Sequence, residues 1–312
     1  MKKVYALFLI LLLPALLSSQ SRDSATTLIF LSDTQAPLWF EKIYLQYEEN
    51  EKATALIFAD ILQKQNVAAV IHGGDLTSHG SDKRSWSQIR PFMDSLRVRS
   101  IPFLAVKGNH DYLFSAGLAM RNFRKYVPET YSDYSSWQFG CAAIVLLNSN
   151  FGQLENSDIL RQQIWYDSTL AAYQKDSTIR FVITVDHHPP FTNDRMVSGS
   201  QEVRERLLPA FYRSSKAVVF VSGHAHRFEH FLKREKDFIV IGGGGGLLHD
   251  ARRNPNEMDL YDGADGGMFF HYARCRVTAD SILFEVVKVT PDSAKKEVVH
   301  RFTLFPPKAA KQ

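Results

Sequence analysis

The sequence predicts an α/β fold, a four-layer α/β/β/α sandwich in which two mixed sheets pack on each other and helices flank them. From residue 28 to residue 222, apolar runs typical of buried strands alternate with segments of helical period. Beyond residue 222, the predicted elements are strands with few helices between them. Alternating strands and helices followed by a run of strands are typical of two packed sheets with helices outside.

The predicted helices are segments of helical period, at 53–65, 82–96, 115–126, 156–173 and 202–213. Pro91 predicts a break or kink in the second of them. The predicted strands are apolar runs, at 28–31, 68–71, 101–106, 135–140, 142–148, 179–185, 217–222, 228–233, 238–241, 268–278, 281–290 and 298–305. The strands at 135–140 and 142–148 turn near Gly140 and begin the second sheet. Residues 36–50 are rich in aromatic and charged side chains without a clear period, and two interpretations stay open, a substrate-facing rim or a surface loop.

The composition indicates an ordinary globular protein. Of its 312 residues, 45% are hydrophobic and 22% are charged, so one large domain over residues 26–305 is expected, followed by a short tail at 306–312. The net charge is +4, and Lys and Arg are scattered without a long basic run. No nucleic-acid-binding module is therefore evident, while a slightly cationic surface favours anionic substrates.

The N-terminus reads as a secretory signal peptide over residues 1–21. Met1-Lys2-Lys3 precedes the apolar run 4–17, and Ser18-Ser19-Gln20-Ser21 follows it. The apolar run is shorter than the ~20 residues that a membrane-spanning helix needs. We expect cleavage and export to the periplasm or the medium, with no stable membrane span left. An uncleaved anchor is the alternative.

The two cysteines, Cys141 and Cys275, both lie in apolar runs of strand character. An exported protein can keep a disulfide. Two buried thiols fit the same pattern, so both interpretations stay open.

Five predicted strands end in side chains that can bind a metal. Following the chain, these loops hold Asp33-Thr34-Gln35, Gly74-Asp75, Asn109-His110-Asp111, Asp186-His187-His188 and His224-Ala225-His226. Strand-end loops present such groups to a ligand, so we expect the side chains to meet at one end of a sheet. Mixed nitrogen and oxygen ligands suit Zn, Fe or Mn.

These five motifs, in this order, resemble the calcineurin-like metallophosphoesterase superfamily of two-metal phosphatases and phosphodiesterases. The resemblance runs from about residue 28 to residue 231. It implies two di- or trivalent ions (Mn, Fe or Zn), the first held by Asp33, Asp75 and His226. The second ion would be held by Asp75, Asn109, His187 and His224, so that Asp75 bridges the two.

The resemblance also implies an activity, the hydrolysis of phosphate mono- or diesters by in-line attack of a metal-bound hydroxide. We expect His110 to bind the phosphoryl oxygens or to protonate the leaving alkoxide, and Asp111 to orient it. Asn109 and His188 are the other expected substrate contacts. The substrate would be a phosphorylated small molecule or a phosphoprotein.

The first motif departs from the usual Asp-x-His pattern, because Gln35 stands where a His is expected. An amide oxygen is neutral and a weaker ligand than an imidazole, so the first metal should bind less tightly. We still expect Gln35 in or beside the first metal site. The alternative function is a non-catalytic phosphate- or metal-binding protein with a weakened first site, although the retained His110 and Asp111 favour an enzyme.

The remaining histidines fit roles as satisfied core residues, namely His72, His79, His230, His249, His271 and His300. His72 has an alternative role as a neighbour of the Asp75 loop. The glycine run 242–246 is expected to be a turn that allows close backbone approach, since no Lys-Ser/Thr pair follows it.

Overall fold

A computed structural model describes residues 25–38, 49–130 and 132–307 of this chain. The predicted signal peptide, and most of the segment 36–50, lie outside these residues. Within the described ranges, no helix has both the length and the apolar character needed to cross a membrane.

The first sheet has six strands and is mixed. Its spatial order is β12 (Lys295–Leu304), β11 (Ile282–Thr290), β10 (Phe270–Val277), β1 (Thr26–Leu31), β2 (Val67–His72) and β3 (Phe103–Ala105). Strand β1 pairs parallel with β2 and antiparallel with β10. The parallel half carries the first three motifs, and the antiparallel half is built from the strand-rich C-terminal region.

The second sheet also has six strands. Its spatial order is β4 (Ser135–Phe139), β5 (Ala142–Leu146), β6 (Phe181–Val185), β7 (Ala217–Ser222), β9 (Lys236–Ile241) and β8 (Phe228–Lys233). Its first two strands form a hairpin, as predicted from the turn near Gly140, where φ is +59°. Strands β5, β6, β7 and β9 run parallel.

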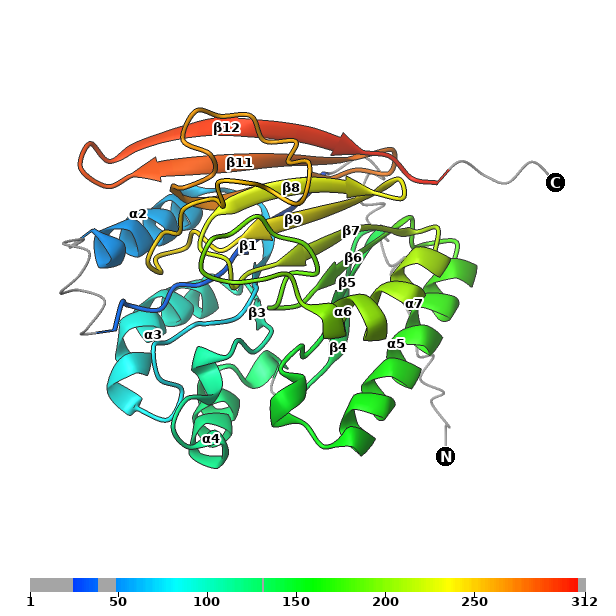
Figure 1. Ribbon diagram of the computed structural model, residues 1–312, viewed down its shortest axis with the longest axis horizontal. Helices are drawn as coiled ribbons and strands as arrows, with labels where there is room; N and C mark the ends of the chain where they lie inside the picture. The colour runs from blue at the N-terminus through cyan, green and yellow to red at the C-terminus, as the bar shows by residue number, and fades with distance from the viewer. Residues whose placement is uncertain (1–24, 39–48, 131, 308–312) are drawn as a thin grey trace, which may run out of the picture.

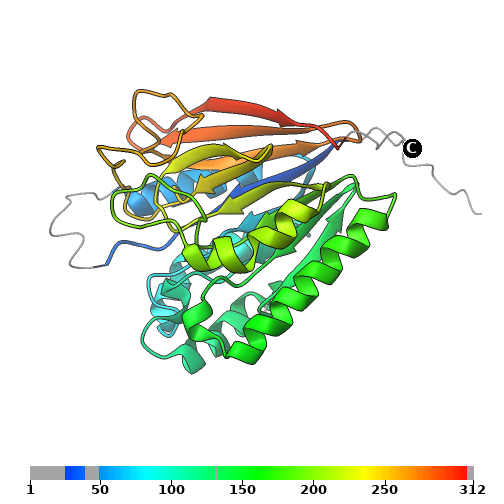
Figure 2. The same cartoon turned by 45° about the vertical axis from the view of Figure 1, so that its right-hand side comes forward.

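Helices cover both outer faces, which gives the predicted four layers (Figure 1). The first sheet is covered by α2 (Asn50–Gln63), α3 (Lys83–Val98) and α4 (Ala116–Tyr126), and the second by α5 (Asn156–Lys175), α6 (Gln201–Arg206) and α7 (Leu208–Arg213). Figure 2 shows α5 lying along the second sheet, on the side away from the first.

Three apolar layers hold this sandwich together, one between the sheets and one between each sheet and its helices. Strand β1 contributes to two of these layers, because successive side chains of a strand point to opposite faces of the sheet. Leu28 and Phe30 pack between the two sheets, whereas Ile29 and Leu31 pack against the helices. All four side chains are fully buried, so the strand reads as a continuous apolar run in the sequence.

One helix prediction is narrowed and another needs correction. Of the break or kink predicted at Pro91, the break is absent, because Trp86, Ile89, Met93 and Leu96 on the inner face of α3 are buried against the sheet. The helix predicted at 202–213 is two helices that meet at Leu207. Pro209 lies in the first turn of the second one, where its missing N–H costs no hydrogen bond.

The five motif-bearing strands belong to both sheets, not to one as predicted. Strands β1, β2 and β3 lie in the first sheet, and β6 and β7 lie in the second. The motif loops therefore meet where the ends of two packed sheets come together.

Both cysteines are free thiols. Cys275 is buried, and the Cys141 thiol donates to the backbone oxygen of Thr278 at 3.2 Å. The sequence left open a disulfide or two unpaired thiols, and the structure has the unpaired thiols.

Candidate metal centre

The motif loops bring all the predicted ligands together. Potential ligand atoms fall into two groups, each with its members within 4.8 Å of one another: Asp33, Asp75 and His226, and His187, His188 and His224. Asn109 Oδ1 lies 3.0 Å from His187 Nε2, beside the second group. Gln35 Nε2 lies 3.1 Å from His226 Nε2, beside the first.

Asp75 lies between the two groups. One carboxylate oxygen, Oδ2, is 3.4 Å from His187 Nε2 and also 3.4 Å from Gln35 Nε2. The other, Oδ1, accepts a hydrogen bond from the backbone N–H of His110 at 2.8 Å. Burial disfavours the charged carboxylate, but the neighbouring imidazoles of His187, His110 and His224 outweigh burial and lower the pKa of Asp75.

Three of these residues adopt a left-handed backbone at the ends of their strands. The φ angles are +59° for Asp33, +55° for Asp75 and +67° for His224. Such a conformation costs a residue with a Cβ roughly 1–2 kcal/mol. Hydrogen bonds between the loops hold it: Asp33 N donates to Gly74 O at 3.0 Å, and both carboxylate oxygens of Asp33 accept from His224 N.

Two glycines let the loops come this close. A Cβ on Gly108 would lie 2.1 Å from Asp75 Oδ1, and a Cβ on Gly74 would lie 2.7 Å from both Gly108 N and His187 Nδ1. Gly74 also has a φ of +95°, which favours glycine. Each glycine is therefore required by the packing around Asp75.

Two imidazoles of the centre, those of His187 and His226, are stabilised in their charged form by the carboxylates, whereas burial and neighbouring imidazoles lower the pKa of His224 and His188. Burial opposes protonation of His187, but the carboxylates of Asp75 and Asp33 and a backbone hydrogen bond raise its pKa to about 10. Burial likewise opposes protonation of His226, and Asp33 raises its pKa. A bound metal cation would be stabilised by the same carboxylates that stabilise these protonated imidazoles.

Backbone carbonyls fix the two imidazole rings. His187 Nδ1 lies 2.8 Å from Gly73 O, and His226 Nδ1 lies 2.6 Å from Leu247 O. A carbonyl only accepts, so each Nδ1 carries the proton and each Nε2 is left for the centre. This arrangement is typical of histidines that bind a metal.

Gln35 supplies the clearest test of whether a metal fits. Its side chain is buried, and its Oε1 has no hydrogen-bond partner among the described residues. The amide nitrogen and oxygen are nearly indistinguishable in shape, so a half-turn of the amide brings Oε1 to the position beside Asp75 and His226. With two carboxylates and an imidazole, this oxygen completes a donor set suited to Zn, Fe or Mn.

His110 and Asp111 begin the short 3-10 helix His110–Tyr112, but Asp111 is not placed to orient the imidazole as predicted. Its buried carboxylate accepts instead from backbone N–H groups, those of Asp75, Leu76, Thr77 and Gly108. His110 Nδ1 lies 3.1 Å from Ser78 O. Asp111 therefore holds the Asp75 loop, and Ser78 holds His110.

His188 and His72 both lie beside predicted ligands. His188 Nδ1 is 2.9 Å from Ser149 Oγ, and the His188 ring centroid is 4.6 Å from that of His224, so this residue, predicted as a substrate contact, lies within the second group. His72 accepts from Gly74 N at Nδ1 and contacts Thr34 Oγ1 through Nε2. Burial lowers the pKa of His72 to about 3, which keeps the ring neutral.

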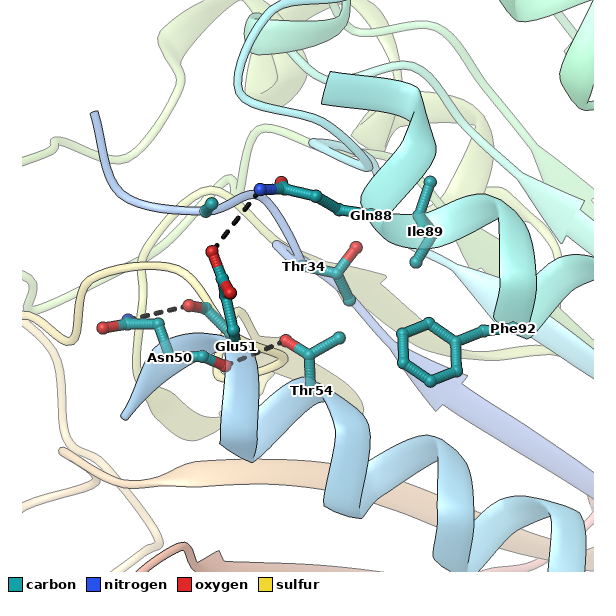
Figure 3. A pocket seen from close by; sticks show the side chains of 9 residues that line it. Thr34, Asn50, Glu51, Thr54, Gln88, Ile89 and Phe92 are labelled. Carbon is teal, nitrogen blue, oxygen red and sulfur yellow. Dashed lines mark hydrogen bonds between the residues drawn. The ribbon is translucent and has the colours of Figure 1, made fainter. Parts of the chain in front are cut away.

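The N-terminal end of α2 donates side-chain hydrogen bonds to the glycine run 242–246, which lies beside the first group. Asn50 Nδ2 donates to Gly245 O and Gly246 O, and Thr54 Oγ1 donates to Gly244 O. These side chains, with Thr34 of the first motif, line a cavity of ≈ 230 Å³ between α2 and α3 (Figure 3). The glycine run is therefore a close backbone contact, as predicted.

Sequence reasoning gave His249 only the role of a satisfied core residue and did not name Asp194. The His249 ring stacks on His226, with centroids 4.3 Å apart and planes 21° apart, and His249 Nδ1 lies 2.9 Å from Asp194 Oδ2. Both residues lie in long loops outside any motif, so no local pattern marks them.

Comparisons with known proteins agree with this geometry. The model of the family described as calcineurin-like phosphoesterase matches residues 26–228. A probable glycerophosphodiester phosphodiesterase of Arcobacter nitrofigilis is 24% identical over 164 residues, which are 51% of this chain and 56% of the relative. Purple acid phosphatase 22 of Arabidopsis thaliana is 24% identical over 222 residues, 64% of this chain and 50% of the relative. The chain thus matches about half the length of these curated relatives.

Solved structures share the fold at low identity. GAP50, described as the anchor in the inner membrane complex of Plasmodium, superposes with a TM-score of 0.71 at 16% identity, covering 92% of this chain and 90% of that one. Purple acid phosphatase PPD1 of yellow lupin gives 0.69 at 15% identity, covering 91% and 54%.

Proposed function

Because the chain belongs to the calcineurin-like phosphoesterase family, we propose that it is a metal-dependent phosphoesterase that hydrolyses phosphate mono- or diesters. The phosphatase and phosphodiesterase named among its relatives support this class of reaction. The observation that carries the proposal is the convergence of carboxylates, imidazoles and an amide from both sheets on one buried centre.

In this proposal the chain holds two metal ions. Asp33, Asp75, Gln35 and His226 hold one, and Asp75, Asn109, His187 and His224 hold the other. When bound, such ions neutralise the phosphoryl oxygens and lower the pKa of water. The ring hydrogen bonds to Gly73 and Leu247 keep the two Nε2 atoms directed at this centre.

His110 is the proposed proton donor to the leaving oxygen. Its backbone N–H is fixed by Asp75 Oδ1, and Ser78 O accepts from Nδ1, which leaves Nε2 for the substrate. Because Nδ1 carries the proton of the neutral ring, a proton is available at Nε2 when the ring is an imidazolium. His188 and Asn109 are the proposed further contacts to the phosphoryl group.

Turnover of p-nitrophenyl phosphate and of bis-p-nitrophenyl phosphate, with Mn or Zn added, tests the proposal. We expect metal-dependent hydrolysis of at least one ester. Asp75→Asn should reduce the rate of hydrolysis by more than about a hundredfold. Substituting a residue that only supports a metal ligand already lowers metal affinity or activity by about 10–100-fold, and Asp75 is a proposed ligand itself.

Asp94→Asn, on the exposed face of α3, serves as the matched control and should retain the activity. Hydrolysis that is absent with every metal, or that survives Asp75→Asn, would contradict the proposal.

A second candidate function is a non-catalytic phosphate- or metal-binding protein. The observation in its favour is Gln35, which weakens the first site. The similar fold of a protein described as an anchor also fits this candidate. Metal binding without hydrolysis in the same assay would favour it.

A further inference from the structure

Around the first metal group, the ring of His226 is held by one short segment of the chain. Leu247 O accepts from its Nδ1. A Cβ on Gly246 would lie 2.8–3.1 Å from three of its ring atoms, so the backbone of this glycine lies against the ring. His249 stacks on the ring at 4.3 Å and donates its backbone N–H to His226 O at 3.0 Å.

Asp194, from a different loop, anchors His249. This carboxylate is fully buried. Its Oδ1 accepts from the backbone N–H groups of Met196 and Val197, at 2.6 and 3.0 Å, and its Oδ2 is 2.9 Å from His249 Nδ1. The carboxylate is therefore fixed independently of His249 and gives the imidazole a defined position.

The two loops are also joined by their backbones. Arg195 N donates to Asp250 O, and Arg252 N donates to Asn193 O. The Arg252 guanidinium donates to Asp194 O and Val197 O. This double connection makes the Asp194–His249 pair a rigid support.

We propose that His249, anchored by Asp194, is a positioning residue for the first metal site, which holds the His226 ring so that Nε2 stays directed at Asp33 and Gln35. His226 Nε2 lies 3.3 Å from Asp33 Oδ1 and 3.1 Å from Gln35 Nε2. Since Gln35 offers only a neutral amide, the affinity of this site depends more heavily on a fixed imidazole. The inference rests on the metal site of the proposed function.

Zinc binding tests it without any measurement of activity. Metal-free protein is dialysed against a series of zinc concentrations, and bound zinc is counted by mass spectrometry. We expect two equivalents for the wild type. His249→Ala should lower the zinc affinity of one of the two sites by about 10–100-fold and leave that of the other site unchanged. Substituting a residue that supports a metal ligand typically lowers metal affinity by this factor. More zinc should restore the second equivalent.

Two further variants separate positioning from folding. His249→Phe keeps a ring against His226 but no partner for Asp194, and its affinity should fall between those of the wild type and His249→Ala. Arg195→Ala, which removes an exposed pair with Asp250 from the same loops, should bind zinc as the wild type does. The metal-free His249→Ala protein should unfold within ~2–4 °C of the metal-free wild type.

Each remaining outcome overturns a stated idea. If His249→Ala binds both zinc equivalents with wild-type affinity, or binds both with equally reduced affinity, the positioning role alone is refuted. A wild type that never takes a second equivalent would refute it too, because the site would not exist. A wild type that binds no zinc, and no manganese in the same dialysis, would overturn the proposed function itself.

Discussion

Gln35 is the residue at which the first metal group is weakest. Its neutral amide lies beside Asp75 and His226, where an imidazole would be the stronger ligand, and its Oε1 has no hydrogen-bond partner among the described residues. A buried carbonyl oxygen without a partner is costly in a protein interior, and a half-turn of the amide would bring this oxygen to the first group, where a cation would satisfy it.

Substitutions of Gln35 should change the first site in both directions. Gln35→Ala removes a ligand and should lower its zinc affinity by about tenfold or more, whereas Gln35→His should raise it. Zinc titration of the metal-free proteins measures both. Gln201→Ala, on the exposed surface of α6, is the control. Equal affinities in all the variants would show that the amide does not bind the metal.

Gly108 offers a second test at the residue scale. A Cβ there would lie 2.1 Å from Asp75 Oδ1, so Gly108→Ala must displace the carboxylate and should abolish tight metal binding. Gly117→Ala is the matched control, since its Cβ meets nothing within 4 Å, and in the helix α4 it should stabilise the fold by ~0.5–1 kcal/mol. A Gly108→Ala protein with two tightly bound metals would contradict this description.

The ligands could be predicted from the sequence because each follows an apolar strand directly. The contacts of Asp111 and His249 could not be predicted in this way. Asp111 is adjacent to His110 in sequence, yet its carboxylate binds the backbone of the Asp75 loop. His249 is brought to His226 only by tertiary contacts with Asp194, which the sequence pattern does not reveal.

At the scale of elements, α2 is attached to the first sheet by a polar contact as well as by apolar packing. Asp60, buried on this helix, accepts hydrogen bonds from the Tyr272 hydroxyl on β10 and from Lys296 Nζ on β12, and pairs with Lys64 at 3.2 Å. Burial raises the pKa of Asp60, but these donors outweigh burial and lower it below its ordinary value.

Asp60→Asn should therefore destabilise the fold by ~1–3 kcal/mol at neutral pH, measured by urea unfolding. Because the folded pKa lies below the unfolded one, the contribution is present above the ordinary carboxyl pKa. It is lost as the pH falls through the folded value. The difference between wild type and variant should thus shrink in acid. A difference that grows in acid would refute the assigned cause.

Two details of the helices were decided by packing or by a proline and not by the sequence pattern. Pro91 removes a hydrogen bond within α3, but the buried face of that helix keeps it continuous. The segment 202–213 has one helical period, yet a new helix begins at Leu208, with Pro209 in its first turn. Both outcomes depend on tertiary context, which a single sequence does not supply.

At the scale of the whole molecule, the candidate metal centre joins the two sheets. Asp33, Asp75 and Asn109 follow strands of the first sheet, while His187, His224 and His226 follow strands of the second. The first metal group therefore draws ligands from both sheets, and the second does so once Asp75 and Asn109 are added to its three histidines. The packing of two sheets was predictable from strand order, but this division of the motifs between them was not.

Metal removal should consequently lower the stability of the entire fold. A ligand present at a hundred times its Kd stabilises by ~2.7 kcal/mol, so a chelator should lower the unfolding temperature by about 5–10 °C. Asp75→Asn should show little response to the chelator. An unfolding temperature that is the same with and without metal would contradict the idea that the ions connect the sheets.

The central claim is that the motif side chains hold two metal ions at the meeting point of the sheets. Anomalous X-ray scattering from crystals of the zinc-loaded protein tests it most directly. We predict two peaks, one bounded by Asp33, Asp75 and His226 and one by Asp75, His187 and His224. Peaks elsewhere on the chain, or none at this centre, would contradict it.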